Sequence, residues 1–575
     1  MFEHFRAAWD ELTAPGAPFA MHEEEVLGVP MRVYDAAPPN MRVLWEATAA
    51  HGDTPYLVYE DERYSYADIH ARVRALAHQL TETFGVGPGD RVAVSMRNYP
   101  EWVISYWATI SVGAALVGMN AWWTGPEMAY ALRDSAPTVL VVDRERLERV
   151  VPLLDELRAE NPLELVVVRH DEIPAGAHRW DDLVDPAAAP DTLPPAEIAP
   201  DDDATIFYTS GTTGFPKGAQ LTHRGSVHNL LNLAFLNTCV AVANQKARAA
   251  GDQPADDAEA SEQLQPAVLL PVPLFHVTGC NCVLHPATAV GGRVVLMYKW
   301  DAGKALEIIE RERITTFTGV PTMSRELLMH PRWAETDTSS LESMGGGGAP
   351  LQPDLVHKID QNLDKGRPST GYGLTETHGI ITAVSADLFV HKPESAGPVV
   401  PVMDAEIRDD EGNHLDVGEL GELWVKGPNV IKGYLNRPEA TAESIVDGWF
   451  RTGDIAFIDD DGFVNIRDRA KDMVLRGGEN VYCAEVEAAI YEHPAVAEAA
   501  VFGIPDERLG EEVAVAIVCA PGHSLTEEEL AEHLAPRLAP FKHPRHVWFL
   551  DEPLPRNANG KFVKRELREK LLAGR

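Results

Sequence analysis

The sequence predicts an α/β protein with a large N-terminal domain of parallel and mixed sheets layered with helices, a β-rich subdomain, and a small α+β C-terminal domain. Three observations support this prediction. Short Val-rich apolar runs alternate with helix-like segments from about residue 40 to 400. Acidic turns and short strand-like runs follow. The last ~100 residues, the size of a small domain, form a separate pattern of helices and strands.

Six apolar runs are expected to be buried strands, because continuous apolar runs separated by helices are typical of parallel sheets covered on both faces. Their length and Val content favour strands over buried helix pieces. Helix-like segments are expected at 127–135 and 302–313. The six runs are RVAVSM (91–96), TVLVVD (138–143), LELVVV (163–168), AVLLPV (267–272), RVVLMY (293–298) and TTFTGV (315–320).

Two later stretches depart from this alternation. Residues 244–265 are polar, rich in Ala and Asp and without apolar periodicity, so we expect a solvated, mobile surface loop there. After about residue 400, the turns DDEGN and DDDGF separate runs expected to form antiparallel strands. The final segments 484–494, 497–506, 511–520 and 526–538 predict helix, strand, strand and helix.

The charge of the chain restricts its partners. With 50 basic and 88 acidic residues, the net charge is −38. A surface this acidic is a poor match for nucleic acid or for anionic membranes. Phosphate groups would need a local pocket built from backbone N–H groups, a few cations and a metal ion. No apolar run reaches the ~18 residues of a spanning helix, and five cysteines give no disulfide framework, so we expect a cytoplasmic protein without a membrane span.

The strongest local motif is IFYTSGTTGFPKG, residues 206–218. A β-like run leads into Gly, Ser and Thr residues closed by Lys217. Glycines allow close backbone approach to an anion, hydroxyls and N–H groups donate to oxygens, and Lys adds charge. The spacing differs from the common P-loop. By itself the motif is equally compatible with a phosphate-binding loop and with a flexible surface turn.

Five further motifs follow in a fixed order, and together they carry a family resemblance. With the loop above, they resemble the adenylate-forming superfamily of acyl-CoA synthetases, peptide-synthetase adenylation domains and luciferases, most of all bacterial fatty-acid–CoA ligases. The resemblance covers essentially the whole chain. The motifs are GGAP (347–350), GYGLTET (371–377), GWFRTGD (448–454), RDRAKD (467–472) and PRNANGK (555–561).

The resemblance implies a nucleotide site. Tyr372 would stack near adenine, Asp454 would accept hydrogen bonds from both ribose hydroxyls, and Arg469 would be a second contact. Without the resemblance, Asp454 and Arg469 would be interpreted as ordinary charged residues in turns. The implied nucleotide-binding residues are Thr209, Ser210, Gly211, Thr212, Thr213, Gly214, Lys217, Gly347, Gly348, Ala349, Gly371, Tyr372, Gly373, Thr375, Asp454 and Arg469.

The same resemblance assigns the catalytic residues Lys561, Glu376, His276 and Lys217. Glu376 would hold Mg²⁺ against the ATP phosphates, as suits a carboxylate and a hard cation. Lys561 would reach in from the small domain and bridge the attacking carboxylate and the α-phosphate, stabilising transition-state charge. Considered alone, each of these two residues is more simply a solvated surface charge.

The resemblance places the acyl pocket at His276, Gly279, His378 and Gly379. Amino-acid-activating members carry Asp where this chain has His276, so the pocket lacks an evident counter-charge and favours a neutral acyl or aryl chain. Structural alternatives for His276 are a core histidine or a metal ligand with Cys280, Cys282 and His285. The spacing gives zinc little support.

The loop 476–486 resembles the one that enters the site in the second step, with Gly477 and Gly478 beside the pantetheine arm of CoA. Cys483 stands where the family usually has Pro. A nucleophilic role for this thiol is not expected, because CoA brings its own. Lys471 resembles the hinge, which implies a large domain 1–468 and a small mobile domain 469–575.

These features predict an ATP-dependent acid–CoA ligase that uses ATP, Mg²⁺ and CoA. A medium- or long-chain fatty acid is the first expectation for the acid. An aryl- or steroid-acid–CoA ligase, a fatty-acyl-AMP ligase that loads a carrier protein, and a non-catalytic nucleotide-binding protein remain alternatives. Assembly as a homodimer is left open, as are the chain length of the acid and the pathway.

Overall fold

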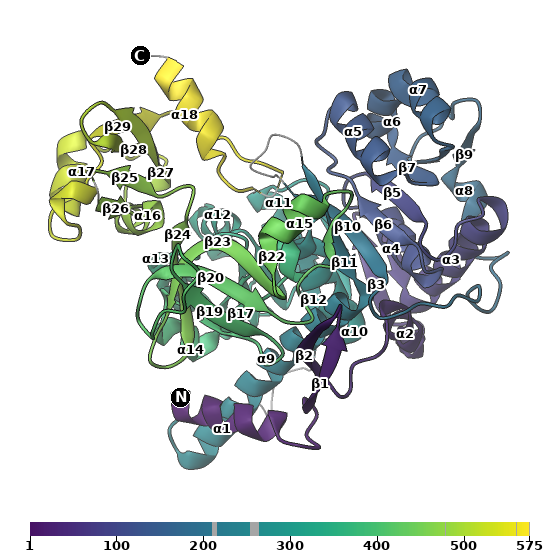
Figure 1. Ribbon diagram of the computed structural model, residues 1–575, viewed down its shortest axis with the longest axis horizontal. Helices are drawn as coiled ribbons and strands as arrows, with labels where there is room; N and C mark the ends of the chain where they lie inside the picture. Colours follow the sequence, from purple (N-terminus) through teal and green to yellow (C-terminus); the bar gives the residue numbers. More distant parts are fainter. Residues whose placement is uncertain (210–215, 254–263, 478, 559, 574–575) are drawn as a thin grey trace.

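The structure is a computed structural model that describes residues 1–209, 216–253, 264–477, 479–558 and 560–573. Within this part of the chain, two eight-stranded sheets form the large domain, a smaller antiparallel sheet lies beside them, and a separate sheet forms the C-terminal lobe. Figure 1 shows that lobe, with β25–β29, α16 and α17, standing apart from the strands of the large sheets. The predicted fold class is confirmed.

The first large sheet is parallel from β10 to β9, and at one edge β11 pairs antiparallel with β10 and β21 pairs antiparallel with β11. Its order is β21 (Gly433–Tyr434), β11 (Lys217–Thr222), β10 (Asp203–Thr209), β6 (Ala115–Gly118), β5 (Arg91–Ser95), β7 (Val139–Asp143), β8 (Glu164–Val168) and β9 (Ala177–Arg179).

The second large sheet is parallel from β16 to β3, with an antiparallel strand at each end. Its order is β17 (Thr382–Ser385), β16 (Arg367–Tyr372), β15 (Ser343–Gly347), β14 (Thr316–Gly319), β12 (Ala267–Leu270), β13 (Arg293–Leu296), β3 (Pro55–Tyr59) and β4 (Glu62–Ser65). All six apolar runs predicted to be strands contain strands of these two sheets.

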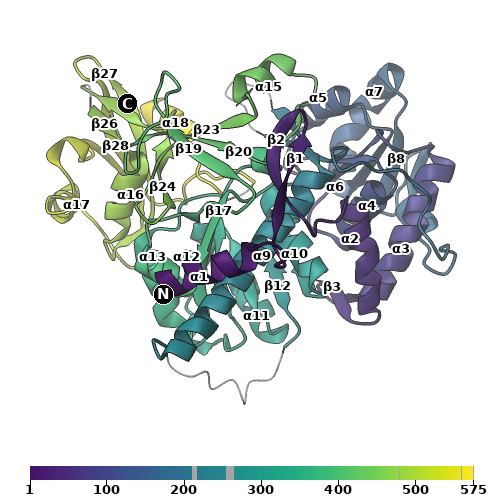
Figure 2. The ribbon, with the colours of Figure 1, turned by 60° about the horizontal axis from the view of Figure 1, so that its bottom comes forward.

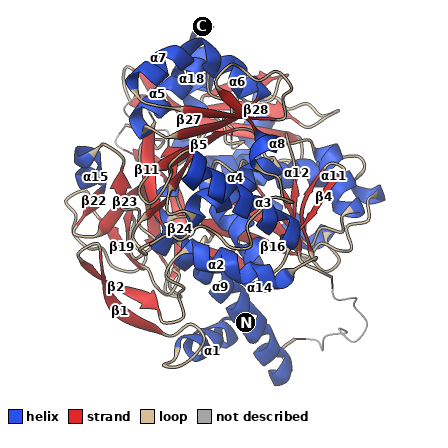
Figure 3. Ribbon diagram, turned by 90° about the vertical axis from the view of Figure 1, so that its right-hand side faces the viewer, coloured by secondary structure: helices blue, strands red, loops and turns tan. Residues whose placement is uncertain are grey.

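Helices cover both sheets, as the blue helices around the red strands show in Figure 3. Helix α4 (Pro100–Ser111) is buried at every residue except Glu101, and it shares a core with strands of both sheets. The predicted helices at 127–135 and 302–313 correspond to α5 (Gly125–Ser135) and α11 (Ala302–Arg311). The other helices that cover the sheets include α2 (Met41–Ala47), α3 (Tyr66–His78), α6 (Arg144–Val150), α7 (Leu154–Glu160), α8 (Trp180–Leu183), α10 (His285–Ala289), α12 (Pro321–Met329), α13 (Pro353–Asn362) and α14 (Ala386–His391).

Helix α9 (His223–Ala250) corrects one prediction. Residues 244–250, expected to be loop, form its last turns, because this Ala-, Lys- and Arg-rich segment consists largely of good helix formers. Ala243 and Ala247 are buried, and Lys246 Nζ lies 2.6 Å from Glu11 of α1 (Phe2–Thr13), which packs along α9 (Figure 2). Gly251, with φ +82°, ends the helix. The prediction for 254–263 falls outside the described residues.

Helix α9 is also, by length and composition, the one described helix that could cross a membrane. Its most apolar 18-residue window has a mean hydropathy of 1.3, and 56% of that window is buried inside the protein. Such burial is typical of a core helix in a layered domain. The expected absence of a membrane span therefore stays a prediction.

The remaining sheets confirm the expected change after residue 400. The antiparallel sheet has the order β18 (Gly397–Pro398), β24 (Phe463–Arg469), β23 (Trp449–Ile458), β20 (Gly421–Lys426) and β19 (Asp404–Arg408), with β22 (Ile445–Val446) paired to β23. The C-terminal sheet joins β26 (Glu479–Val481), β25 (Val474–Arg476), β28 (Gly510–Cys519) and β27 (Val496–Asp506), with β29 (His546–Leu550) parallel to β28.

Helices pack on the C-terminal sheet in the predicted order, with α16 (Cys483–Tyr491) before β27 and α17 (Glu527–Leu534) after β28. The last helix, α18 (Lys564–Ala573), contributes Leu567 to a second small core on the opposite side. The chain passes from the antiparallel sheet to the C-terminal sheet between Arg469 and Val474. The proposed hinge residue, Lys471, is exposed in this short turn. The exact domain division stays a prediction.

Candidate active site

The candidate site lies where the two large sheets, the antiparallel sheet and the C-terminal lobe meet. Its residues come from the ends of β10 and β11, the loop after β15, the end of β16, and strands β23 and β24. Ligands of open α/β sheets characteristically bind beyond the carboxyl ends of the strands. The predicted residues Ser210, Gly211, Thr212, Thr213, Gly214 and Gly478 lie outside the described residues.

Asp454 is the most enclosed charge of the site. Its side chain is only 4% exposed, and its two oxygens have different partners. Arg469 Nε lies 2.6 Å from Oδ1, and the Tyr372 hydroxyl donates to Oδ2 at 2.6 Å. Burial raises the pKa of Asp454 above its usual value, and the charge of Arg469 opposes that shift. Both oxygens thus accept hydrogen bonds, as a pair of ribose hydroxyls would require.

The glycine-rich strands form a thin wall beside this carboxylate. Gly347 pairs with Gly371 across β15 and β16. A Cβ on Gly347 would lie 2.7 Å from the Gly371 carbonyl oxygen, and one on Gly373 would collide with the carbonyl of Gly379. Gly348 follows with φ +84°, and Ala349 is exposed. Larger side chains would therefore disturb this wall at Gly347 and Gly373.

Lys561 enters the site from the C-terminal lobe. A Cβ on Gly348 would lie 3.0 Å from Lys561 Cε and 3.4 Å from Nζ. Burial is the largest influence on this ammonium and lowers its pKa to about 8, with Arg469 acting in the same direction and Asp454 and Glu376 opposing. The structure thus brings Lys561 within electrostatic reach of the predicted ribose, metal and acyl residues.

His276 is half-buried and lies within electrostatic reach of Lys561. Burial, with a smaller contribution from Lys561, lowers its pKa to about 3, so the imidazole is neutral at ordinary pH. Its Nε2 is buried without a hydrogen-bond partner in the described part of the chain. A neutral ring beside a cation offers no charge to pair with a substrate ammonium.

Glu376 lies in a single 3-10 turn, Thr375–Thr377, after β16. Its Oε1 accepts hydrogen bonds from Tyr434 (2.9 Å) and from Thr209 (3.3 Å). Lys217 Nζ lies 5.0 Å from the centre of the same Tyr434 ring. The structure therefore gathers Thr209, Lys217 and Glu376 around a tyrosine that no sequence motif had singled out.

The other predicted acyl-pocket residues take structural positions. His378 is fully buried, accepts from the Thr222 N–H at Nε2 (2.8 Å) and donates from Nδ1 to the Asn429 carbonyl (2.6 Å). A Cβ on Gly379 would collide with Asn229 and Cys282, and one on Gly279 with the Pro273 carbonyl. These contacts hold the wall together, and a direct contact with substrate stays a prediction for all three residues.

The described part of the predicted CoA loop belongs to the C-terminal lobe. The Gly477 N–H donates to the Leu509 carbonyl at 2.8 Å, within the C-terminal lobe. Cys483 is buried at the start of α16, and its thiol donates a hydrogen bond to the Asp472 carbonyl at 3.1 Å. Burial raises the pKa of this thiol above its usual value. A buried thiol of raised pKa is a poor nucleophile.

Metal ligation by His276, Cys280, Cys282 and His285 finds little support. Among the described residues, no group of three or more His, Cys, Asp or Glu side chains is arranged to hold a metal ion. The one close pair, Cys280 Sγ and His285 Nε2, is 3.5 Å apart in the core.

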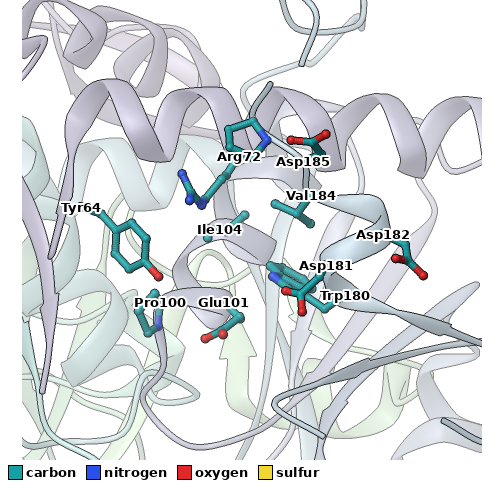
Figure 4. A pocket seen from close by; sticks show the side chains of 11 residues that line it. Tyr64, Arg72, Pro100, Glu101, Ile104, Trp180, Asp181, Asp182, Val184 and Asp185 are labelled. Atoms are coloured by element: carbon teal, nitrogen blue, oxygen red, sulfur yellow. The ribbon is translucent and has the colours of Figure 1, made fainter. Parts of the chain in front are cut away.

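A cavity of about 510 Å³ lies elsewhere, between β4, α3, α4 and α8 (Figure 4). Tyr64, Arg72 and Trp180 line it together with acidic residues of the 181–185 segment. None of the predicted site residues belongs to its lining.

Comparison with known proteins decides the family. The model of the AMP-binding enzyme family matches residues 44–435, and that of the AMP-binding enzyme C-terminal domain matches residues 485–561. The chain belongs to the AMP-binding enzyme family. The predicted membership of the adenylate-forming superfamily is thereby confirmed, and the chain is an AMP-forming ligase of this family.

Known relatives align with this chain over nearly its full length. A feruloyl-CoA synthase of Amycolatopsis sp is 37% identical over 88% of this chain and 94% of its own. The long-chain-fatty-acid–CoA ligase FadD13 of Mycobacterium tuberculosis is 36% identical over 89% and 94%. The structure of the anthranilate CoA ligase AuaEII in complex with anthranoyl-AMP has a TM-score of 0.80 and 25% identity, covering 93% and 98%.

Proposed function

We propose that this family member is an ATP-dependent acid–CoA ligase for a hydrophobic carboxylic acid. In the first step, a carboxylate oxygen attacks the α-phosphorus of ATP, and pyrophosphate leaves. In the second, the sulfur of CoA attacks the acyl carbonyl carbon, and AMP leaves. The first step turns a poor electrophile into a mixed anhydride with a good leaving group.

The position of Lys561 carries this proposal. A lysine of the C-terminal lobe lies against Gly348 and within electrostatic reach of Asp454, Glu376 and His276. A cation at this point would reduce the repulsion between an attacking carboxylate and the α-phosphate and would stabilise transition-state charge. The lowered pKa of Lys561 reflects burial before those anions are bound.

Asp454, Arg469 and Tyr372 are proposed as the nucleotide-holding group. The ribose hydroxyls would take over hydrogen bonds that Asp454 now receives from Tyr372 and Arg469. The adenine base would pack against the thin wall of Gly347, Gly348 and Ala349, which Gly371 and Gly373 continue.

The Glu376 carboxylate fits a magnesium ion by its chemistry. Only Oε1 is hydrogen bonded to described side chains, and Glu376 joins no metal-binding group of three or more carboxylate, His or Cys side chains in the described chain. Mg²⁺ is commonly held by one or two carboxylates plus substrate phosphates and water. Bound Mg²⁺ would supply charge neutralisation of the polyphosphate, while Lys217 and Thr209 would contact phosphate oxygens directly.

For the acid, the neutral His276 favours an acyl part without a positive charge. A medium- or long-chain fatty acid is the first candidate, supported by the likeness to FadD13. An aryl acid is the second, supported by the likeness to feruloyl-CoA synthase and to AuaEII.

For the second step, we propose that rotation about Lys471 exchanges Lys561 for the loop containing Gly477 and Gly478, which would border the pantetheine arm. CoA is the proposed acceptor, and a carrier protein is the alternative. A cytoplasmic location and assembly as a homodimer stay predictions.

Separate assays of the two half-reactions test the proposal. With Mg-ATP and a panel of acids from C4 to C18 plus aryl and steroid acids, we expect acid-dependent pyrophosphate release and acyl-CoA detectable by mass spectrometry. Lys561→Ala should lose acyl-adenylate formation about 100-fold or more, while thioester formation from supplied acyl-adenylate continues.

Other results of these assays would contradict the proposal or favour an alternative. Equal loss of both half-reactions in Lys561→Ala would reject the role of Lys561. Acid-dependent pyrophosphate release with CoA left unconsumed would favour the carrier-loading ligase. Failure of every acid to yield AMP would reject the activity.

A further inference from the structure

Tyr434 lies at the edge of the first large sheet, outside every recognised motif. Strand β21 pairs antiparallel with β11, which places Tyr434 opposite Ala219, two residues after Lys217. The Tyr434 N–H donates to Thr441 Oγ1 at 2.9 Å, and the neighbouring Leu435 N–H donates to the Gly218 carbonyl at 2.8 Å. The residue is only 8% exposed, so its ring has a fixed position beside strand β11.

The hydroxyl of Tyr434 holds one oxygen of Glu376. It donates to Oε1 at 2.9 Å, and Thr209 donates to the same atom at 3.3 Å. The Ile431 N–H also donates to the Glu376 backbone carbonyl at 2.9 Å. Both the backbone and the first carboxylate oxygen are thus fixed by neighbours, and no described residue hydrogen bonds to Oε2.

The ring of Tyr434 contacts the ammonium group of Lys217. Lys217 Nζ lies 5.0 Å from the ring centre, within the range of a cation–π interaction. Lys217 and Glu376 therefore contact the same side chain, one at the ring and the other at the hydroxyl. An ammonium and a carboxylate that contact one side chain attract each other, and the attraction grows as water is excluded from between them.

We propose that Tyr434 is a positioning residue that keeps Lys217 and Glu376 apart and orients both for Mg-ATP. The hydroxyl turns Glu376 so that Oε2 is free for the metal ion. The ring keeps Lys217 available for phosphate oxygens. This inference rests on the proposed function, in which Lys217 contacts phosphate and Glu376 holds Mg²⁺.

The test measures binding of α,β-methylene-ATP by calorimetry, with and without Mg²⁺, because its α–β bridge cannot be cleaved and no turnover interferes. In Tyr434→Phe, which keeps the ring, half-saturation by Mg²⁺ should need about tenfold more metal, since a hydrogen bond to a charged group is lost. Affinity in EDTA should stay at the wild-type value. Tyr434→Leu should lose affinity in EDTA as well, because Lys217 is no longer held away from Glu376.

Tyr208→Phe is the matched control. The Tyr208 hydroxyl also donates to a carboxylate, Asp134, at 2.9 Å, and the residue is 7% exposed, but its side chain belongs to the core on the other face of the sheet. This variant should bind the analogue as the wild type does, with the same dependence on Mg²⁺. A similar change in Tyr208→Phe and Tyr434→Phe would overturn the proposal.

A double-mutant comparison separates orientation from general loosening. If the hydroxyl acts through Glu376, Tyr434→Phe should not change the Mg²⁺ dependence any further in a Glu376→Gln background. Wild-type Mg²⁺ dependence in Tyr434→Phe, or equal loss with and without Mg²⁺, would overturn the positioning role alone. Absence of Mg²⁺-dependent binding in the wild type would instead reject the proposed function.

Discussion

Asp454 and Arg469 are direct partners across the β23–β24 ladder, and Arg469 Nε lies 2.6 Å from Asp454 Oδ1. Their separation of fifteen residues along the chain is therefore the length of a hairpin that returns Arg469 to the level of Asp454. The Tyr372 hydroxyl, from the second large sheet, donates to the other oxygen at 2.6 Å. The nucleotide-holding group is thus preassembled from two sheets.

The first prediction concerns Asp454→Asn. The amide keeps the shape of the side chain but removes the charge and one acceptor, so hydrogen bonds from both ribose hydroxyls can no longer be accepted. Hydrogen bonds to charged groups contribute about 1.5–3 kcal/mol each, which predicts a rise of about 100-fold in the KM for ATP. Tyr372→Phe keeps the carboxylate and should change this KM much less. An unchanged KM in Asp454→Asn would reject the ribose assignment.

The second prediction concerns Gly348→Ala. The new Cβ would lie 3.0 Å from Lys561 Cε, and φ of +84° disfavours a side chain there. We expect acyl-adenylate formation to fall about tenfold, because both effects together cost on the order of 1–2 kcal/mol. Thioester formation from supplied acyl-adenylate should be retained.

Gly462→Ala is the control for Gly348→Ala. Gly462 has φ +80° but no atom within 4 Å of the added Cβ, so it introduces the same backbone strain away from Lys561. If both variants lose the first half-reaction equally, contact with Lys561 is not the cause.

The third prediction concerns pH. Burial lowers the pKa of Lys561 to about 8, and only the charged ammonium can bridge two anions. The kcat/KM for ATP in acyl-adenylate formation reports the free enzyme, so it should fall about tenfold per unit as pH rises above about 8. In Lys561→Arg, which stays charged, this decline should disappear, although the rate itself is lower. A Lys561→Arg profile identical to that of the wild type would contradict the assignment.

The sequence predicted the strands best where they are most buried. Val-rich runs such as 138–143 and 163–168 have no alternative to a sheet core, and each contains a strand. The prediction of a loop at 244–250 is wrong because the polarity of this segment masks good helix formers, and because its buried residue, Ala247, is small. Only the packing of α1 on α9 shows which face of this segment is apolar.

The candidate site was predicted where motifs are continuous along the chain. Lys561, Asp454 and Glu376 could be named from local patterns, and the family is confirmed by the comparisons. Tyr434 could not, because its contacts with Glu376 and Lys217 depend on the pairing of β21 with β11, strands far apart in sequence. His378 was predicted to line the acyl pocket because it follows a motif. The sequence alone does not indicate that both of its ring nitrogens form hydrogen bonds with backbone groups.

The fourth prediction concerns the contact between the large domain and the C-terminal lobe. Arg556, in the loop that carries Lys561, lies 2.9 Å from Glu326 on α12, and it also pairs with Glu498 inside its own lobe. Glu326→Gln weakens the pair between domains, and its amide oxygen can still accept the hydrogen bond that the Trp300 indole N–H donates to Glu326 Oε2 at 2.5 Å. Because the two side chains are partly exposed, we expect a contribution of about 0.5–1 kcal/mol, hence acyl-adenylate formation reduced about two- to fivefold.

The second half-reaction distinguishes a domain contact from general damage. If Glu326 stabilises only the arrangement with Lys561 in the site, thioester formation from supplied acyl-adenylate should be unchanged or faster in Glu326→Gln, because departure of the lobe becomes easier. Glu498→Gln is the comparison, since it breaks a pair within the lobe and should lower its thermal stability without favouring either half-reaction. Slowing of both half-reactions in Glu326→Gln would show that this ion pair supports the fold and does not select between domain arrangements.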